Sequence, residues 1–461
     1  MRTLRDSGHA LADGLAHIRR QFDVPAGFAP EVLAAADEAV LRPLTDHVDR
    51  TSMPFVTLDP AESRDLDQAF TIESSGDDLL LHYAIADVGW FVADGDVLDV
   101  EAWKRGESLY LPDGKSSLYP TTLSEGAASL LPDDVRPAVI FTVRLGADSE
   151  PALDGAERAV IRSRAKLAYD SVQTTDLPAS FGEFGRRMVA SDARRGATRI
   201  DPPEQGVERD SDGRYHLEFR PRLLSESQNA AMSLATNLAV AQAMLAAHTG
   251  LFRVMPEPDK RAVSRLRHTA RALGLEWPDS QSLADRERQL DGGDPKQAAL
   301  MMAIRRASRG ARYAEYDAGE RPWHAAMAAS YAHATAPLRR LADRYVVQAT
   351  LALANARPVP DNVLDAFSRL PDAMTRADVG AGQIDRAVID LAEAVALQPR
   401  VGDTFMAVVT DDDERGARIQ LCDVAVVSRI QVDGLHPGDN IRVKLVSADP
   451  AGRAVVFERV A

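Results

Sequence analysis

The sequence has little cysteine, no surplus of positive charge and no long apolar run. Its one cysteine, Cys422, excludes an internal disulfide and a cysteine-based zinc site, and is typical of a reducing compartment. The net charge of −15 is not that of a protein that coats nucleic acid through bulk charge. No apolar run reaches membrane-spanning length, and no signal-peptide pattern follows Met1. We therefore expect a cytoplasmic protein that does not enter a membrane.

The chain of 461 residues is long enough for two or three domains. Residues 1–50 have apolar positions at helical spacing on both sides of a break at Pro25 and Gly27, which predicts a helical N-terminal region. Residues 51–398 begin with strand-like runs and continue with helical patterns. Residues 399–461 contain about five short strand-like runs separated by turns, which is typical of an OB-type barrel. This order predicts an α+β fold.

One predicted helix carries a row of arginines. The pattern at residues 295–316 predicts a single helix with three arginines on one side, Arg305, Arg309 and Arg312. Arginine on a helix usually faces solvent, but beside a nucleic-acid path it would bind phosphate. The sequence leaves both interpretations open.

A second predicted helix, at residues 337–355, has Pro337 in its first turn, where proline is favoured. Arg339 would then lie beside unpaired backbone N–H groups at the positive end of the helix dipole. That position is a natural site for a phosphate group. We expect the neighbouring His333 and Asp343 to make structural hydrogen bonds.

A polar loop at residues 58–70 carries three aspartates between two apolar runs. If the loop is extended near its end, Asp65 and Asp67 point the same way, and Asp59 lies close by. Carboxylates this close repel one another and ionise readily only with a cation between them. Their oxygens are the ligands that Mg²⁺ and Mn²⁺ prefer. The pattern predicts either a divalent-metal site or a solvated acidic turn.

Six motifs between about residues 53 and 354 give this loop its context. In chain order they are DPAESRDLDQA, HYAIADV, SLYLPD, LSEGAASLLPDDVRPA, SRAKLAYDSVQ and YAHATAPLRRLADRYV. Together they resemble the catalytic RNB domain of the ribonuclease II and ribonuclease R family. The resemblance implies an RNB-type catalytic domain at residues 51–398, with a central, mostly antiparallel sheet flanked by helices. It also implies that the barrel at residues 399–461 is an OB-fold RNA-binding module.

The activity implied by this resemblance is 3′→5′ hydrolysis of single-stranded RNA to nucleoside 5′-monophosphates with Mg²⁺, for which Mn²⁺ is an alternative. Asp59, Asp65 and Asp67 correspond to three of the four acids that hold metal in the family. Gln68 takes the place of the fourth acid and offers one neutral oxygen. Arg339 corresponds to the arginine at the scissile phosphate. The implied catalytic residues are therefore Asp65, Asp67 and Arg339.

The resemblance also implies contacts with RNA. Tyr110 corresponds to a tyrosine that stacks on the 3′-terminal bases, a contact that contributes roughly 1–3 kcal/mol per base, although a core tyrosine is the alternative. Tyr169 corresponds to a tyrosine that holds the 3′ end and helps to select RNA. Glu226 is either a ribose contact that recognises the 2′-hydroxyl or an ordinary exposed helix residue. Arg340 is either a further phosphate contact or a surface charge.

Two rival functions remain open. Gln68 favours an RNA-binding protein that keeps the fold without catalysis. Residues 1–50 are too short for the paired cold-shock barrels of the long family members, which favours a phosphodiesterase acting on very short RNA or DNA. Residues 1–50 themselves are either a packing subdomain, which we favour, or a small nucleic-acid-binding unit. The sequence does not identify the natural RNA, protein partners or the oligomeric state.

Overall fold

The computed structural model of the chain describes most of its residues. These are residues 2–3, 10–148, 150–198, 204–209, 215–220, 222–291, 294–308, 310–413, 416–432 and 434–460. Within these ranges, none of the helices combines the length and the apolar character that crossing a membrane requires.

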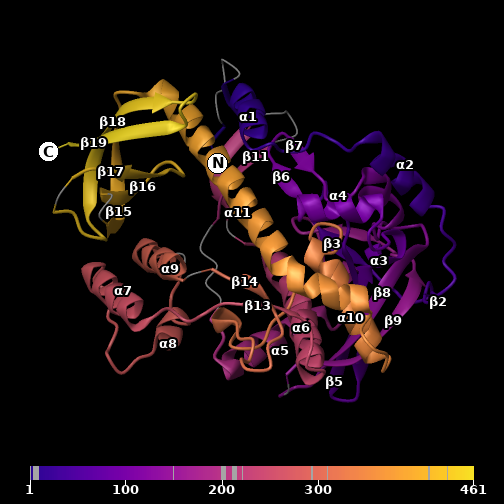
Figure 1. The fold of residues 1–461 in the computed structure, drawn as a ribbon. Coiled ribbons are helices and arrows are strands. Elements are labelled where there is room, and N and C mark those ends of the chain that lie inside the picture. Colours follow the sequence, from indigo (N-terminus) through magenta and orange to yellow (C-terminus); the bar gives the residue numbers. More distant parts are fainter. Residues whose placement is uncertain are drawn as a thin grey trace.

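A five-stranded sheet in the order β2-β9-β8-β5-β4 lies at the centre of the larger part of the molecule (Figure 1). Its four long strands pair antiparallel, and a short fifth strand joins β9 in parallel. The strands are β4 (Gln68–Ser75), β5 (Asp78–Ala86), β8 (Arg136–Leu145), β9 (Ala152–Ile161) and β2 (Val48–Asp49). Most of β8 is buried, as expected for an interior strand covered by other elements. The prediction of a mostly antiparallel central sheet is confirmed.

Helices cover this sheet. They are α5 (Phe181–Arg195), α6 (Leu224–Ala246) and α10 (Leu341–Ala354), and α11 (Asp361–Leu397) packs against α10. Helices α6 and α10 pack against β9 and against each other, and the small side chains of Ala235 and Ala239 let α6 approach closely. Helix α11 has 37 residues and is about 55 Å long at 1.5 Å per residue. It runs across the molecule to the C-terminal barrel (Figure 1).

The remaining elements of the larger part are short. Its other helices are α1 (Ala10–Gln21), α2 (Pro30–Ala39), α3 (Val88–Phe91), α4 (Val97–Arg105), α7 (Lys260–Ala272), α8 (Leu283–Glu287) and α9 (Pro295–Ala307). Its small sheets pair β3 (Thr57–Asp59) with β10 (Lys166–Ala168), β6 (Leu109–Leu111) with β7 (Gly114–Ser116), β13 (Leu251–Val254) with β14 (Arg312–Glu315), and β12 (Tyr215–Arg220) with both β1 (Arg2–Thr3) and β11 (Glu204–Arg209). Helix α1 packs against α11, whereas α2 packs against α4.

Residues after α11 form a five-stranded antiparallel barrel in the order β17-β16-β15-β18-β19. The strands are β15 (Thr404–Asp413), β16 (Gly416–Leu421), β17 (Val427–Ile430), β18 (Asn440–Asp449) and β19 (Ala454–Val460). The end strands β17 and β19 touch, so the barrel is nearly closed. Its interior is filled by alternating apolar residues such as Val409, Ile419 and Val443, all fully buried. The predicted OB-type barrel is confirmed.

The prediction of one helix at residues 295–316 is wrong. Helix α9 ends at Ala307, and Arg312 begins strand β14, which pairs antiparallel with β13. Ser308 after the helix is already extended, with φ −71° and ψ 136°, and Gly310 has a φ of +73°, a left-handed conformation that glycine adopts readily and that does not continue a helix. Pairing with β13 then outweighs the local helical preference. Arg309 lies outside the described residues, and Arg312 is no longer in line with Arg305.

The predicted start of the helix at Pro337 is also wrong. Helix α10 begins at Leu341, and Arg340 before it is extended, with φ −133° and ψ 124°. The reason is a tertiary contact. The Ser108 N–H donates to the Arg339 carbonyl, and the Leu341 N–H donates to the Gly106 carbonyl, both at 2.9 Å. Arg339 therefore lies in a turn before the helix and not in its first turn.

One buried acid joins the barrel to the rest of the molecule. Glu393 of α11 is 2% exposed, and its Oε1 accepts hydrogen bonds from Gln205 Nε2 of β11 at 2.6 Å and from the Val427 N–H of β17 at 2.9 Å. Burial raises the pKa of Glu393 to about 7, although these two donors favour the ionised form. Ionisation of Glu393 therefore destabilises the folded state at neutral pH.

Replacing Glu393 with Gln should stabilise the protein at pH 8 and have little effect near pH 5. The unfolded chain ionises Glu393 at its ordinary pKa, whereas the folded chain ionises it only near pH 7, so the wild type loses stability as the pH rises between these values. We expect a gain on the order of 1–3 kcal/mol at pH 8, measured by thermal and denaturant unfolding at both pH values. Glu38→Gln, at an exposed site on α2, is the control. A pH-independent difference between Glu393→Gln and wild type would contradict the assignment.

Candidate active site

The three aspartates lie at one end of the central sheet, in the segment between β3 and β4. Asp59 ends β3, which pairs in parallel with β10, and Asp67 directly precedes β4. The segment between them is held on both sides. The Leu66 N–H donates to Ser129 Oγ, and the Ala86 N–H donates to the Asp67 carbonyl, both at 2.9 Å. The backbone therefore fixes where the carboxylates emerge.

Asp67 is the buried member of the cluster, 5% exposed. Its Oδ1 accepts the Leu338 N–H at 2.7 Å, and its Oδ2 lies 3.2 Å from Arg339 Nε. Burial raises the pKa of Asp67 to about 7, and Arg339 opposes this shift. Burial likewise raises the pKa of Asp59 to about 6, Arg339 and Lys166 lower it, and the charge of Asp65 raises it further. The three predicted aspartates and Arg339 thus share one electrostatic site.

Asp65 contacts a hairpin that follows α4. Its Oδ2 accepts the Tyr110 hydroxyl at 2.9 Å and lies 3.1 Å from Lys115 Nζ, which also pairs with Glu125 Oε1 at 2.6 Å. Tyr110 and Lys115 face each other across strands β6 and β7. Tyr110 is 52% exposed, so it is not a core tyrosine. Sequence reasoning missed Lys115, although the PDG turn at residues 112–114 could have indicated its pairing with Tyr110.

Arg339 and Arg340 follow each other in the chain but have different surroundings. The Arg339 side chain is 47% exposed and faces Asp67. Arg340 makes two hydrogen bonds to Asp343, from Nε at 3.0 Å and from Nη2 at 2.8 Å, and the fully buried Asp343 also accepts the Ala336 N–H. Arg340 is therefore not a loose surface charge, because it holds the turn that presents Arg339.

Gln68 lies beside the aspartates, but its amide oxygen is engaged. Gln68 Oε1 accepts the hydroxyl of Tyr83, which is fully buried on β5. Burial, followed by the nearby Tyr169 and Asp59, raises the pKa of Tyr83, so this hydroxyl stays protonated as a donor. In this arrangement the oxygen of Gln68 that could replace a fourth carboxylate already has a partner.

Tyr169 lies beside Asp59, whose carbonyl accepts the Tyr169 N–H at 3.2 Å, and Glu226 lies near Tyr169. The Tyr169 hydroxyl accepts a hydrogen bond from Asn229 Nδ2 at 2.8 Å, and the same nitrogen donates to the Leu58 carbonyl at 3.2 Å. Glu226 Oε2 accepts the Leu223 N–H at 2.7 Å, which caps the start of α6. Asn229, one helical turn after Glu226, is the residue of α6 that reaches the Tyr169 hydroxyl, whereas Ser225 Oγ donates to the Tyr169 carbonyl at 2.7 Å. The sequence analysis missed Asn229, although the spacing of three residues on one helix indicates a shared face.

Metal binding can be tested against these contacts. Among the described residues, no group of three His, Cys, Asp or Glu side chains has the geometry of a metal site. The aspartate oxygens are instead neutralised by Arg339 and Lys115. The donor chemistry nevertheless fits a hard divalent cation, because two carboxylates with raised pKa values lie beside a third. Asp59, Asp65 and Asp67 are the residues that could hold it.

Comparison with known proteins gives two family matches. Residues 47–355 match the RNB domain, and residues 403–460 match the C-terminal S1 domain of RNase II-type exonucleases. Ribonuclease R of Thermotoga maritima is 24% identical over 458 residues, a match that covers 91% of this chain and 63% of that protein. The chain therefore spans less than two thirds of the length of this relative.

Solved structures share the fold. RNase R of Mycoplasma genitalium, in complex with ribose-methylated single-stranded RNA, has a TM-score of 0.85 at 19% identity, covering 100% of this chain and 79% of that one. Yeast Ssd1, described as a pseudonuclease, has a TM-score of 0.70 at 16% identity, covering 97% of this chain and 58% of that one. At these identities the likeness shows the fold alone, and the fold occurs in a ribonuclease and in a pseudonuclease.

Protons and divalent cations should compete for the aspartates. With pKa values of about 6 for Asp59 and about 7 for Asp67, both carboxylates are largely ionised at pH 8, and protonation increases as the pH falls to 6. We expect the Kd for Mn²⁺, measured by calorimetry, to be about tenfold weaker at pH 6 than at pH 8. Asp67→Asn should weaken binding at pH 8, whereas Asp94→Asn, in an exposed loop, should not. Equal affinity of the wild type at both pH values would argue against this site.

Proposed function

Because this chain belongs to the RNB-domain family, which includes ribonuclease R, we propose that it is a 3′→5′ exoribonuclease that hydrolyses single-stranded RNA to nucleoside 5′-monophosphates. The main support for the proposal is that residues distant in the sequence meet at the carboxylate of Asp67. Its buried carboxylate binds Leu338 and Arg339, which come from a segment 271 residues later in the chain. Such a costly buried charge is typical of a functional site.

Arg339 is suited to bind the scissile phosphate. Its guanidinium is half-exposed and is held toward the aspartates by a turn that Asp343 and Arg340 fix in place. A guanidinium donates paired hydrogen bonds to phosphate and keeps its charge at every relevant pH. In the proposed reaction Arg339 orients the phosphate and offsets the negative charge that grows during attack by water.

We assign Mg²⁺, or Mn²⁺ in its place, to Asp59, Asp65 and Asp67. When bound there, a divalent ion supplies positive charge beside the phosphate and makes a nearby water easier to deprotonate. Lys115 and Arg339 provide positive charge at the same carboxylates in its absence. Gln68 contributes least to this assignment, because its amide oxygen already accepts the Tyr83 hydroxyl.

The polar residues around Asp59 support recognition of the RNA 3′ end. The Tyr169 hydroxyl and the Asn229 amide form a hydrogen-bonded pair next to the aspartates. Hydroxyl and amide groups at such a position can bind the 2′-hydroxyl, which distinguishes RNA from DNA. Glu226 supports this pair by capping α6, so we propose it as a residue that positions Asn229.

A non-catalytic RNA-binding protein is the second candidate. It is favoured by the engagement of Gln68 with Tyr83 and by the likeness to Ssd1, a pseudonuclease. A single degradation assay separates the two candidates. Release of mononucleotides from 5′-labelled oligo(A) with Mg²⁺ supports the exoribonuclease, and binding without shortening supports the non-catalytic protein. A length series with a DNA control also tests for a phosphodiesterase of short fragments.

Asp67→Asn should keep RNA affinity and abolish most cleavage. The substitution removes the charge but keeps a side chain of the same shape, whose amide oxygen can still accept the Leu338 N–H. We expect the rate of mononucleotide release to fall by at least about 100-fold, with the Kd for oligo(A) within about threefold of wild type. The exposed Asp94→Asn variant is the matched control. Turnover like that of the wild type in Asp67→Asn would contradict the catalytic assignment.

Two substitutions at Tyr110 should separate base stacking from its hydrogen bond to Asp65. Tyr110→Ala removes the exposed ring and should weaken oligo(A) binding by about 5- to 150-fold, which corresponds to roughly 1–3 kcal/mol. Tyr110→Phe keeps the ring but loses the hydroxyl that Asp65 accepts, so its affinity should stay close to wild type. Fluorescence anisotropy measures both. Equal losses in the two variants would show that the hydroxyl, and not the ring, provides the contact.

A further inference from the structure

A lysine that belongs to none of the six sequence motifs lies at the aspartates. Lys115 Nζ is 3.1 Å from Asp65 Oδ2 and 2.6 Å from Glu125 Oε1. The side chains of Lys115 and Asp65 are only 21% and 11% exposed, so water screens this contact less than it screens an ordinary surface ion pair. Glu125 also lies 3.7 Å from Arg64, which provides a second cation for that acid. Lys115 therefore brings a positive charge into the candidate active site.

The hairpin that carries Lys115 is held in place by the N-terminal region. Arg19 of α1 donates two hydrogen bonds to the Asp113 carboxylate, both at 2.8 Å, and one to the Gly114 carbonyl at 2.7 Å. Gly114 has a φ of +135°, which glycine adopts readily in such a turn. These contacts fix the start of β7 and so the position from which the Lys115 side chain emerges.

Lys115 occupies one oxygen of Asp65 and leaves the other available. Lys115 and Tyr110 are partners across β6 and β7, and both contact the same oxygen, Asp65 Oδ2. In the part of the chain that the structure describes, Asp65 Oδ1 makes no hydrogen bond. A carboxylate held in this way can bind a cation through Oδ1 while Lys115 stays at Oδ2.

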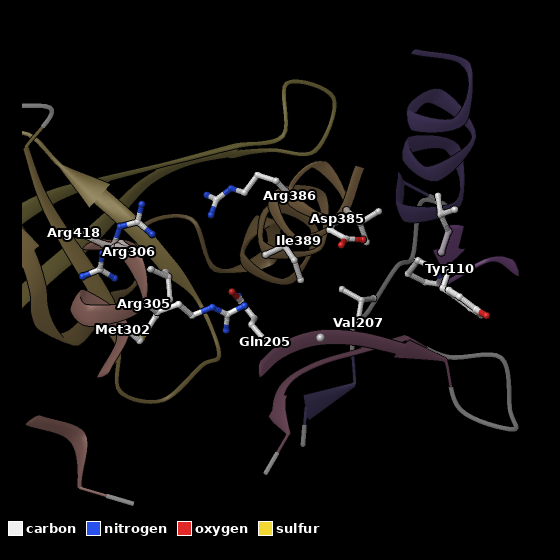
Figure 2. Close-up of a pocket in the computed structure, with 15 residues that line it drawn as sticks. Tyr110, Gln205, Val207, Met302, Arg305, Arg306, Asp385, Arg386, Ile389 and Arg418 are labelled. Carbon is white, nitrogen blue, oxygen red and sulfur yellow. The ribbon is translucent and has the colours of Figure 1, made fainter. Parts of the chain in front are cut away.

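The other cations near the aspartates have different positions. Arg339 faces Asp67, whereas Lys166 Nζ donates to the Ala61 carbonyl at 2.6 Å. Figure 2 shows Tyr110 well apart from the arginines of α9 and β16. Among the described residues, Lys115 is thus the cation that is paired with Asp65.

The charge of the site matches one divalent cation. When ionised, the three aspartates together with Lys115 carry a net charge of −2, which one divalent cation balances. A site with a fourth acid in place of Gln68, and without the lysine, would carry −4, which two such cations balance. Gln68 is also poorly placed to hold a second ion, because its amide oxygen accepts the Tyr83 hydroxyl.

We propose that this site binds one divalent cation and that the Lys115 ammonium takes the place of a second. The inference rests on the proposed function, because that function assigns the divalent cation to the aspartates. In this role Lys115 offsets negative charge on the phosphate beside Asp65, since an ammonium group donates strong hydrogen bonds to phosphate oxygens. Gln68 and Lys115 then act together on the charge of the site, and Gln68 is compatible with catalysis.

Calorimetric titration with Mn²⁺ at pH 8, in the absence of RNA, tests this role. Wild type should bind one ion per chain. Lys115→Met should bind its first ion at least about tenfold more tightly than wild type, because a positive charge close to Asp65 is lost. Lys115→Arg keeps the charge, so its Kd should stay within about threefold of wild type. Gln68→Glu combined with Lys115→Met supplies a fourth acid and removes the lysine, and should bind two ions per chain.

Lys104→Met is the matched control, because Lys104 on α4 is exposed and pairs with Glu101 at 3.9 Å, and thermal unfolding checks that each variant folds. A lysine that only fastens the hairpin would leave the Mn²⁺ affinity of Lys115→Met unchanged and the double variant with one bound ion. That result, or two ions bound to wild type, would overturn the proposal. Mn²⁺ binding as expected, without release of mononucleotides from oligo(A), overturns the exoribonuclease and leaves the role of Lys115 in place. Wild type that binds no Mn²⁺ overturns the metal assignment and the role of Lys115 together.

Discussion

The arrangement of the site depends on the burial of one carboxylate. Asp67 is almost inaccessible, and a charge in that position requires donors close by. Its donors, the Leu338 N–H and Arg339, lie on a turn that Asp343 holds from within and that residues 106 and 108 hold from outside through backbone hydrogen bonds. Three segments distant in sequence must therefore assemble before Asp67 has its partners. The central sheet and the helices around it fix the relative positions of those segments.

The sequence correctly predicts the parts of this fold that depend on interactions between residues close together in the chain. The central sheet and the barrel follow from alternating apolar residues and turns, and the three aspartates with Arg339 follow from motifs. The start of α10 does not, because backbone bonds to residues 106 and 108 keep Arg340 extended where local preference favours a helix. The end of α9 is similar, since pairing of β14 with β13 overrides the helical pattern.

The residues that sequence reasoning missed at the site have a common cause. Lys115 reaches Asp65 only because the β6–β7 hairpin folds against Asp65, and Asn229 reaches Tyr169 only because the start of α6 lies against the residue that follows β10. The local pattern can indicate that Lys115 pairs with Tyr110 and that Asn229 shares a helix face with Glu226, but it does not indicate the contacts with Asp65 and Tyr169, which are distant in the sequence. For Gln68, the residue type alone was a poor guide to its role. Its type suggested a weak metal ligand, whereas the structure shows the oxygen engaged by Tyr83.

The charge distribution sets a condition on any polyanionic substrate. Three aspartates repel a phosphate chain, and Arg339 and Lys115 offset only part of that repulsion because they also neutralise the carboxylates. The attraction between the protein and its substrate must then come from contacts with other parts of the strand. Contacts with the rest of the strand can supply it at a distance from the scissile bond. Binding energy gained there offsets the cost of bringing the last phosphate against the acids, a use of remote contacts that favours the reaction itself.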